Sequence, residues 1–125
     1  MSIKFKGPVI KGKGLGRKLG FPTINIVFKT EKTGVFAGEV LIDGKWLPAA
    51  IHIGKRISTD NKYSCEAYII GWSGGIDEGT VIQMKLGEKI RDVLKFNSLD
   101  DLKVQIAKDV EFTKNWYNLT GGKNF

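Results

Sequence analysis

The chain has 125 residues, of which 42% are hydrophobic and 26% charged, a composition typical of one globular domain spanning residues 1–125 and too short for two cores. A single cysteine excludes an internal disulfide, and neither a membrane-spanning apolar run nor a secretion signal is evident, so we expect a cytosolic protein without a membrane partner. The net charge of +7 favours an anionic ligand, which could be nucleic acid, an acidic membrane or a small phosphorylated molecule.

The first predicted strand, residues 3–12, leads into a basic loop rich in glycine. Four glycines of this loop stand among three cations: Gly12, Gly14, Gly16 and Gly20 with Lys13, Arg17 and Lys18. Glycine lets backbone N–H groups approach a ligand, and the cations neutralise its charge, so the loop predicts a phosphate site. Its spacing matches neither common phosphate fingerprint, and a strand follows it in place of a helix. The alternative is an ordinary basic surface turn.

Short β-like segments then recur along the chain, separated by Gly, Asp and Asn. We predict strands over residues 23–28, 34–42, 45–54, 63–72 and 80–91, the last one bent at Gly87. Asp43-Gly44 is a strong signal for a hairpin between two of them. Five or six antiparallel strands without an intervening helix indicate a barrel or a tight sandwich, which hides an apolar face and protects the sheet edges.

Only the end of the chain is helical in pattern. Ser98 can cap a helix with Asp101 three places later, and Gly121-Gly122 marks the far end. An apolar stripe at spacings of three and four should pack on the sheet: Leu99, Leu102, Ile106, Val110 and Thr113. We expect Trp116 and Tyr117, in the last turn, to pack against the barrel.

One carboxylate stands in an otherwise apolar predicted strand. Strand alternation puts Glu66 and Tyr68 on one face and Cys65, Ala67 and Ile69 on the other. Glu66 could simply face solvent, or it could act as a general base that receives a proton from a hydroxyl.

Three stretches resemble the riboflavin kinase family. The first is GLGRKLGFPTIN, where the family has a basic glycine-rich loop followed by L-G-[FI]-P-T-A-N, so that Ile24 replaces an alanine. The second is AAIHIGKR followed by SCEAYII, and the third is LGEKIRDVLKFNSLDDLKVQIAKD. The three occur in the family's order and cover about Gly7 to Asp109. A coincidence in all three is improbable, whereas one motif alone would only be suggestive.

The chain departs from the family pattern at four positions besides Ile24. His52 replaces an asparagine, Tyr68 a frequent histidine and Val93 a glutamate, while Glu78 occupies a tyrosine position. We interpret His52 as a substituted structural position and not as an acid or base. The loss of the glutamate at Val93 could loosen or retune contacts with flavin.

The resemblance implies a mainly β fold, a six-stranded antiparallel Greek-key barrel with a C-terminal α-helix. It also implies phosphorylation of riboflavin at its 5′-hydroxyl by Mg²⁺-ATP, giving FMN and ADP. Glu66 would be the catalytic base, and Thr23 and Asn25 would offer hard oxygen ligands to Mg²⁺. The implied nucleotide-binding residues are Gly12, Gly14, Gly16, Lys18, Gly20, Thr23, Ile69, Gly71 and Glu78, and the implied flavin-binding residues are Arg91, Leu94 and Phe96.

The short chain suggests a monofunctional form, since it has no room for the adenylyltransferase domain of many bacterial relatives, and we expect a monomer. Two other functions stay open. One is a flavin- or nucleotide-binding module that has lost activity, suggested by His52, Glu78 and Val93. The other is a basic barrel that binds nucleic acid, although only Phe21 offers a base-stacking aromatic beside the basic loop.

Overall fold

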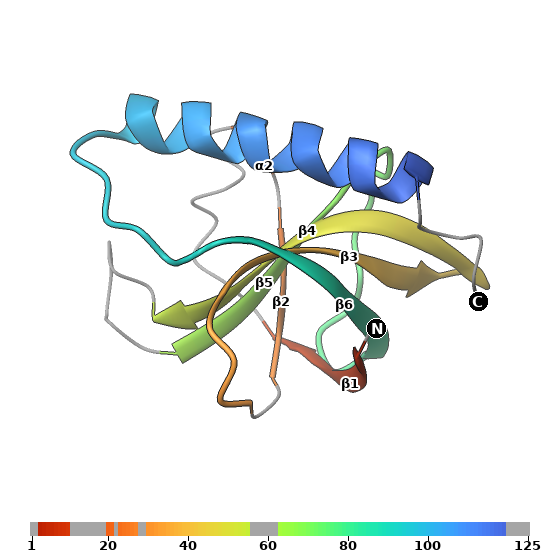
Figure 1. Ribbon diagram of the computed structural model, residues 1–125. Helices are drawn as coiled ribbons and strands as arrows, with labels where there is room; N and C mark the ends of the chain where they lie inside the picture. Colours follow the sequence, from red (N-terminus) through yellow and green to blue (C-terminus); the bar gives the residue numbers. More distant parts are fainter. Residues whose placement is uncertain (1–2, 11–19, 22, 28–29, 56–62, 120–125) are drawn as a thin grey trace.

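The computed structural model describes residues 3–10, 20–21, 23–27, 30–55 and 63–119, which form six strands and one helix (Figure 1). The elements are β1 (Ile3–Ile10), β2 (Ile24–Ile26), β3 (Gly34–Ile42), β4 (Lys45–Lys55), β5 (Tyr63–Ile69), β6 (Val81–Arg91) and α2 (Leu99–Leu119). The predicted strands and helix are therefore all present in the described part of the chain. β5 is shorter than predicted because a turn follows it, with Gly71 at a φ of 77°.

The six strands close into an antiparallel barrel in the order β1-β2-β5-β4-β3-β6. β3, β4 and β5 are consecutive neighbours, and β6 returns to lie beside β3, which is the Greek-key arrangement. The β3–β4 hairpin turns at Asp43 and Gly44, both with positive φ, as the Asp-Gly pair predicts. The pairing of β3 with β6 is irregular between residues 35 and 38, opposite the predicted bend at Gly87. The predicted six-stranded barrel with a C-terminal helix is confirmed.

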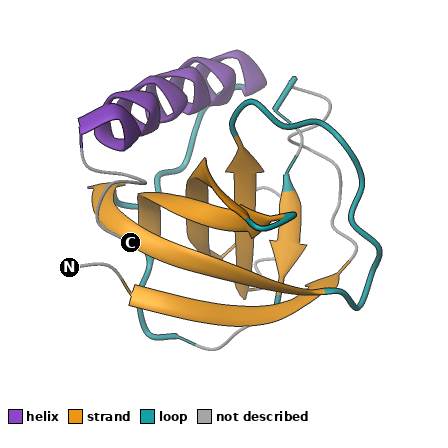
Figure 2. Ribbon diagram, turned by 90° about the vertical axis from the view of Figure 1, so that its right-hand side faces the viewer, coloured by secondary structure: helices purple, strands orange, loops and turns teal. Residues whose placement is uncertain are grey.

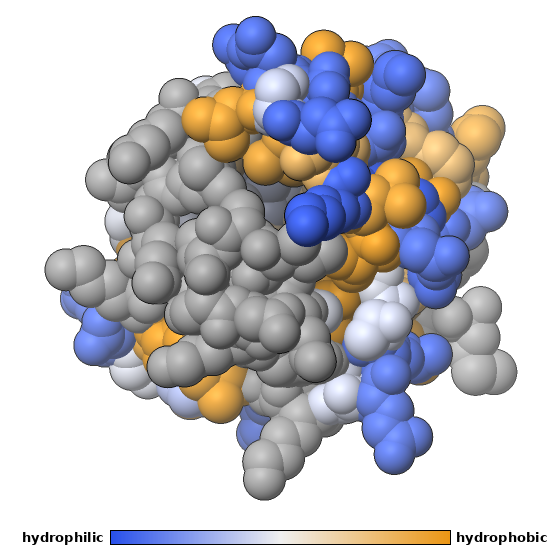
Figure 3. Space-filling model, turned by 90° about the vertical axis from the view of Figure 1, so that its left-hand side faces the viewer, coloured by the Kyte–Doolittle hydropathy of each residue, from blue (hydrophilic) through white to orange (hydrophobic). Residues whose placement is uncertain are grey.

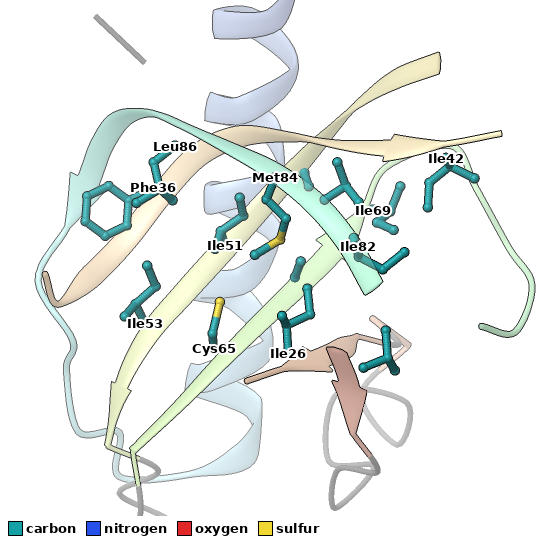
Figure 4. Close-up of a cluster of buried hydrophobic side chains, with 14 residues drawn as sticks. Ile26, Phe36, Ile42, Ile51, Ile53, Cys65, Ile69, Ile82, Met84 and Leu86 are labelled. Atoms are coloured by element: carbon teal, nitrogen blue, oxygen red, sulfur yellow. The ribbon is translucent and has the colours of Figure 1, made fainter. Parts of the chain in front are cut away.

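The barrel interior is a continuous apolar core to which β3, β4, β5 and β6 each contribute three side chains, and β1 and β2 one each (Figure 4). Ile51, Ile53, Cys65 and Ile26 point into it, so the alternate residues of the same strands point outward. Burial raises the pKa of the Cys65 thiol above its ordinary range, with the neighbouring Glu66 charge adding to the effect. Cys65 is thus a core residue that stays protonated.

The helix α2 lies across the outside of the barrel, over β3 and β4 (Figures 1 and 2). Ser98 caps it, because its Oγ accepts a hydrogen bond of 3.1 Å from the N–H of Asp101. Val110 and Thr113 are buried as predicted, but Leu99 is 56% exposed, so the predicted stripe begins one turn too early. None of the helices in the described residues is both long and apolar enough to cross a membrane.

Small residues on the barrel let the helix approach closely. Ala37 and Ala50 are buried outside the core cluster, and a Cβ at Gly87 would lie 2.2 Å from the Trp116 ring. The Tyr117 hydroxyl donates a hydrogen bond of 3.1 Å to the Trp46 carbonyl. Both aromatic residues of the last turns therefore pack on the barrel, as predicted.

Candidate active site

A row of five side chains crosses the outer face of the barrel, one from each of five adjacent strands. The strand register gives the neighbours directly: Asn25 with Glu66, Glu66 with His52, His52 with Val35, and Val35 with Arg91. Residues directly opposite in antiparallel strands have Cβ atoms about 4.5–5.5 Å apart. The row therefore follows the curved outer surface of the closed barrel, with an amide, a carboxylate and an imidazole on three neighbouring strands and a guanidinium two strands beyond the imidazole.

Asn25 and Glu66 stand at one end of this row. Asn25 is 6% exposed and Glu66 is half-buried, although both face away from the barrel core. Thr23 directly precedes β2 and is also half-buried. Phe21 packs edge to face on Tyr68, with ring centroids 5.4 Å apart, so the end of the basic loop reaches the strand that carries Glu66. Asn25 and Glu66 thus lie side by side on the outer surface, and Thr23 precedes the same strand as Asn25.

His52 occupies the centre of the row. Its Nδ1 is buried and has no hydrogen-bond partner among the residues that the structure describes. Burial lowers the pKa of the imidazole from its ordinary value of 6.5 and the nearby Arg91 charge lowers it further, whereas the backbone of His52 itself and then the Asp109 charge act to raise it. His52 is accordingly a neutral imidazole at neutral pH, with an unused polar atom.

Arg91 ends the row, and α2 fixes its side chain. Its Nε and Nη2 donate hydrogen bonds to Asp109 at 3.0 and 2.8 Å, and its Nη1 donates to the Asp92 carbonyl at 3.2 Å. Gln105 donates a further bond of 3.1 Å to Asp109. The guanidinium also lies 5.6 Å from the centroid of the Phe96 ring. Arg91 is therefore engaged mainly by the protein and joins β6, α2 and the loop between them.

The loop from Asp92 to Ser98 borders the row on the side where α2 begins. Val93 lies so close to Gly54 that a Cβ there would be 3.0 Å from its side chain, and Gly54 has a φ of 151°. Phe96 is half-buried and Leu94 is 51% exposed. Hydrophobic and hydrophilic residues lie next to one another over the described part of the face shown in Figure 3. The loop thus offers apolar side chains at the Arg91 end of the row.

The expected nucleotide-binding residues are only partly described. Gly12, Gly14, Gly16 and Lys18 lie outside the described residues. Gly20 and Gly71 are exposed turn residues with φ of 87° and 77°, and Glu78 is exposed in the loop before β6. Ile69 is 3% exposed with its side chain in the barrel core, so only its backbone faces outward. Of these residues, Gly20 directly precedes Phe21, whose ring packs on Tyr68, two positions after Glu66.

The donor set near Glu66 fits a metal that is shared with a substrate. The described residues contain no group of three or more His, Cys, Asp or Glu side chains able to hold a metal ion by themselves. The Thr23 hydroxyl and the Asn25 amide are oxygen donors, and Mg²⁺ is usually bound by a few protein oxygens together with phosphate oxygens and water. These residues are therefore compatible with Mg²⁺ that arrives with a nucleotide.

Asp109 is the main feature of the site to which sequence reasoning gave no role. It fits the resemblance motif, but a single acidic residue within a helix gives no sign of its partner. The only sequence signal is that Asp109 directly precedes Val110, a member of the predicted buried stripe. The structure shows that Asp109 is itself 3% exposed. A charged residue next to a buried stripe position is rarely buried unless it is paired.

Most of the chain is similar to known riboflavin kinases. A family model described as flavokinase, riboflavin kinase, matches residues 1–117. The bifunctional riboflavin kinase/FMN adenylyltransferase of Haemophilus influenzae is 38% identical over 117 residues, which cover 90% of this chain and 38% of that protein. The chain therefore spans well under half the length of that relative.

Two solved structures share the fold. Riboflavin kinase from Trypanosoma brucei is 27% identical with a TM-score of 0.66, covering 94% of this chain and 80% of that one. A macrolide-efflux protein from Streptococcus pneumoniae is 30% identical with a TM-score of 0.78, covering 90% of this chain and 38% of that one.

Proposed function

Because the chain belongs to the riboflavin kinase family, we propose that it transfers the terminal phosphoryl group of ATP to the 5′-hydroxyl of riboflavin, giving FMN and ADP. The single observation that best supports this reaction is the direct cross-strand pairing of Asn25 with Glu66. It sets an oxygen donor for a metal-bound phosphate next to a carboxylate that can take a proton. In phosphoryl transfer, metal ions neutralise the phosphate oxygens while a base orients the attacking hydroxyl and accepts its proton.

Glu66 is the proposed general base. Its carboxylate accepts the proton of the 5′-hydroxyl as that oxygen forms its bond to phosphorus and the bond to ADP breaks. The strand holds the carboxylate on the outer face between Asn25 and His52, because the alternate residues Cys65 and Ala67 are fixed in the core. The reaction therefore depends on positioning by a rigid strand.

Thr23 and Asn25 would hold Mg²⁺ through their side-chain oxygens. Mg²⁺ would neutralise charge on the phosphate oxygens of ATP. We assign the rest of the nucleotide contact to the glycine-rich loop, with Gly12, Gly14, Gly16, Lys18 and Gly20 at the phosphates, and to Gly71, Glu78 and the backbone of Ile69. The choice of ATP, the choice of Mg²⁺, a monomeric state and a cytosolic location remain predictions.

The flavin ring would bind at the other end of the row. Phe96 and the exposed Leu94 supply apolar surface there, and Arg91 supports Phe96 while it is tied to Asp109. Exposed large apolar side chains often line ligand sites, and here they would pack on the flat flavin ring. Leu94 and Phe96 would thus be direct contacts, whereas Arg91 would act mostly through its neighbours.

Incubation of the purified protein with riboflavin, ATP and MgCl₂, followed by chromatography, tests the proposal. We expect FMN to accumulate together with an equal amount of ADP, and neither to form when ATP or MgCl₂ is omitted. Riboflavin recovered unchanged by a folded protein at all nucleotide and metal concentrations would contradict the proposed reaction.

A further inference from the structure

The outer row runs from Glu66, the proposed base, to Arg91, beside the proposed site of the flavin ring. Glu66 and Arg91 are separated by the two strands that carry His52 and Val35. Neighbouring strands lie about 4.8 Å apart, so the path along the curved barrel surface from Glu66 to Arg91 is roughly 14 Å long, and the straight-line distance is shorter because the barrel is closed. The charges of Arg91 and Asp109 both act on His52, which places the β4 and β3 side of the barrel between the two groups. A substrate that presents a terminal hydroxyl to Glu66 and a ring to Phe96 along this side passes His52 and Val35.

The two residues in the middle of the row differ in what they offer to such a substrate. Val35 is apolar and 3% exposed, so it can only form part of the floor. His52 has a buried Nδ1 without a partner among the described residues. A buried polar nitrogen that makes no hydrogen bond is costly, which favours a ligand atom as its partner. His52 is then the polar group that the middle of a bound substrate meets.

The surroundings of His52 define the kind of group it can bind. The charged groups that face it are Glu66 on β5, Arg91 on β6 and Asp109 on α2. Burial and the Arg91 charge keep the pKa of the imidazole low, so the ring is neutral and carries one donor and one acceptor nitrogen. A hydroxyl can both donate and accept, and so it matches either tautomer.

We infer that His52 hydrogen-bonds a hydroxyl in the middle of the substrate's polyhydroxylated side chain, and that it thereby sets the terminal hydroxyl at Glu66. This inference rests on the proposed function and adds a substrate-positioning residue to it. His52 lies one strand spacing, about 4.8 Å, from Glu66, a distance that a chain of a few carbon atoms covers. The contact selects a flavin with a hydroxylated chain over one without it.

Binding of two flavins that share a ring but differ in the chain tests this inference. Riboflavin carries the polyhydroxylated chain, and lumiflavin carries a methyl group in its place. Fluorescence titrations without nucleotide compare the unsubstituted protein with His52→Phe, which keeps a flat ring but loses both nitrogens. We expect His52→Phe to weaken riboflavin binding about 5- to 50-fold, the range for a hydrogen bond to a buried polar group, and to leave lumiflavin binding within about twofold.

A second variant guards against a folding defect. His52→Asn keeps a donor and an acceptor, and we expect it to restore most of the preference for riboflavin over lumiflavin while its thermal unfolding stays cooperative. Equal losses for both flavins, or no loss for riboflavin, in folded variants would overturn the role of His52 alone. If the unsubstituted protein bound lumiflavin and riboflavin equally, that result would also overturn it. A failure of the unsubstituted protein to bind any flavin would overturn the proposed function together with this inference.

Discussion

Arg91 and Asp109 form a forked ion pair, with Nε 3.0 Å from Oδ1 and Nη2 2.8 Å from Oδ2. Their side chains are only 14% and 4% exposed, so solvent screens the pair weakly. The pair joins the last residue of β6 to the middle of α2, and Gln105 donates a further hydrogen bond to the same carboxylate. It therefore holds the helix against the end of the row that carries the site.

Asp109→Asn should destabilise the protein by about 2–4 kcal/mol, because it leaves the Arg91 charge covered and without its carboxylate. Urea unfolding followed by circular dichroism measures the change. Asp92→Asn is the matched control, since Asp92 pairs with Lys89 at 2.7 Å while its side chain is 80% exposed. We expect the control to change stability far less, because solvent screens an exposed ion pair. Equal effects of the two substitutions would contradict a stabilising role for the buried Arg91–Asp109 pair.

Gly87→Ala should loosen the C-terminal half of α2. The new Cβ would lie 2.2 Å from Trp116 and 2.8 Å from the Ala37 carbonyl oxygen, so either the helix or the strand must shift. Overpacking of this kind costs about 1–3 kcal/mol. Thermal unfolding and the near-ultraviolet signal of the tryptophans report it. Gly75→Ala is the control, because no atom lies within 4 Å of its Cβ position, and an equal loss there would remove the steric explanation.

Glu66→Gln should lower kcat by about 10²- to 10⁴-fold, the usual range for removing a general base, while riboflavin still binds. The amide keeps the size and the hydrogen-bonding geometry of the carboxylate but cannot accept the proton. FMN formation and a flavin titration measure the two quantities separately. Glu88→Gln makes the same chemical change at an exposed position of β6 and should leave both unchanged. Normal turnover by Glu66→Gln would remove the assigned base.

Asn25→Ala should raise the Mg²⁺ concentration that gives half-maximal activity by at least about tenfold, because it removes one of two proposed protein oxygens near the metal. Excess Mg²⁺ should restore part of kcat. Activity measured against MgCl₂ at saturating ATP gives the shift, and Asn115→Ala on the exposed face of α2 is the control. An unchanged Mg²⁺ dependence in a folded variant would exclude Asn25 as a ligand.

His52 should make the folded state sensitive to acid. Its pKa is lowered in the fold from an ordinary value of 6.5, so the unfolded chain takes up the proton first as the pH falls. Its stabilising contribution is complete above pH 6.5 and is lost as the pH falls through that value towards the folded pKa. The free energy of unfolding, measured from pH 8 to pH 5, should fall more for the unsubstituted protein than for His52→Asn. Parallel curves for the two proteins would contradict this prediction.

Most of the fold could be predicted from local sequence signals. Alternation separated Cys65 and Ala67 from Glu66 correctly, because the barrel core accepts only one face of each strand. Asp43-Gly44 marked its hairpin, and Ser98 marked the start of the helix. Leu99 was assigned to the buried stripe and is exposed, because the first turn of α2 extends past the barrel surface instead of lying on it.

The site could be predicted only in part, because it depends on which strands are neighbours. Thr23 and Asn25 lie some 40 positions before Glu66 in the sequence, and only the motif resemblance placed them together. His52 was interpreted as a structural substitution, since a single histidine carries no information about its cross-strand partner. The forked pair of Arg91 with Asp109 was missed for the same reason: two charges 18 positions apart meet only once the helix has docked.

The place of β1 between β2 and β6 also bears on how the protein reaches its native state. The first strand finds its second neighbour only after residues 81–91 have been made, so the ring cannot be completed by growth from one end. Bringing such distant segments together costs chain entropy before the core forms, and topologies of this kind fold slowly. During synthesis, the apolar side chains of the early strands therefore stay exposed until β6 is available, and at this stage chaperones would be most useful.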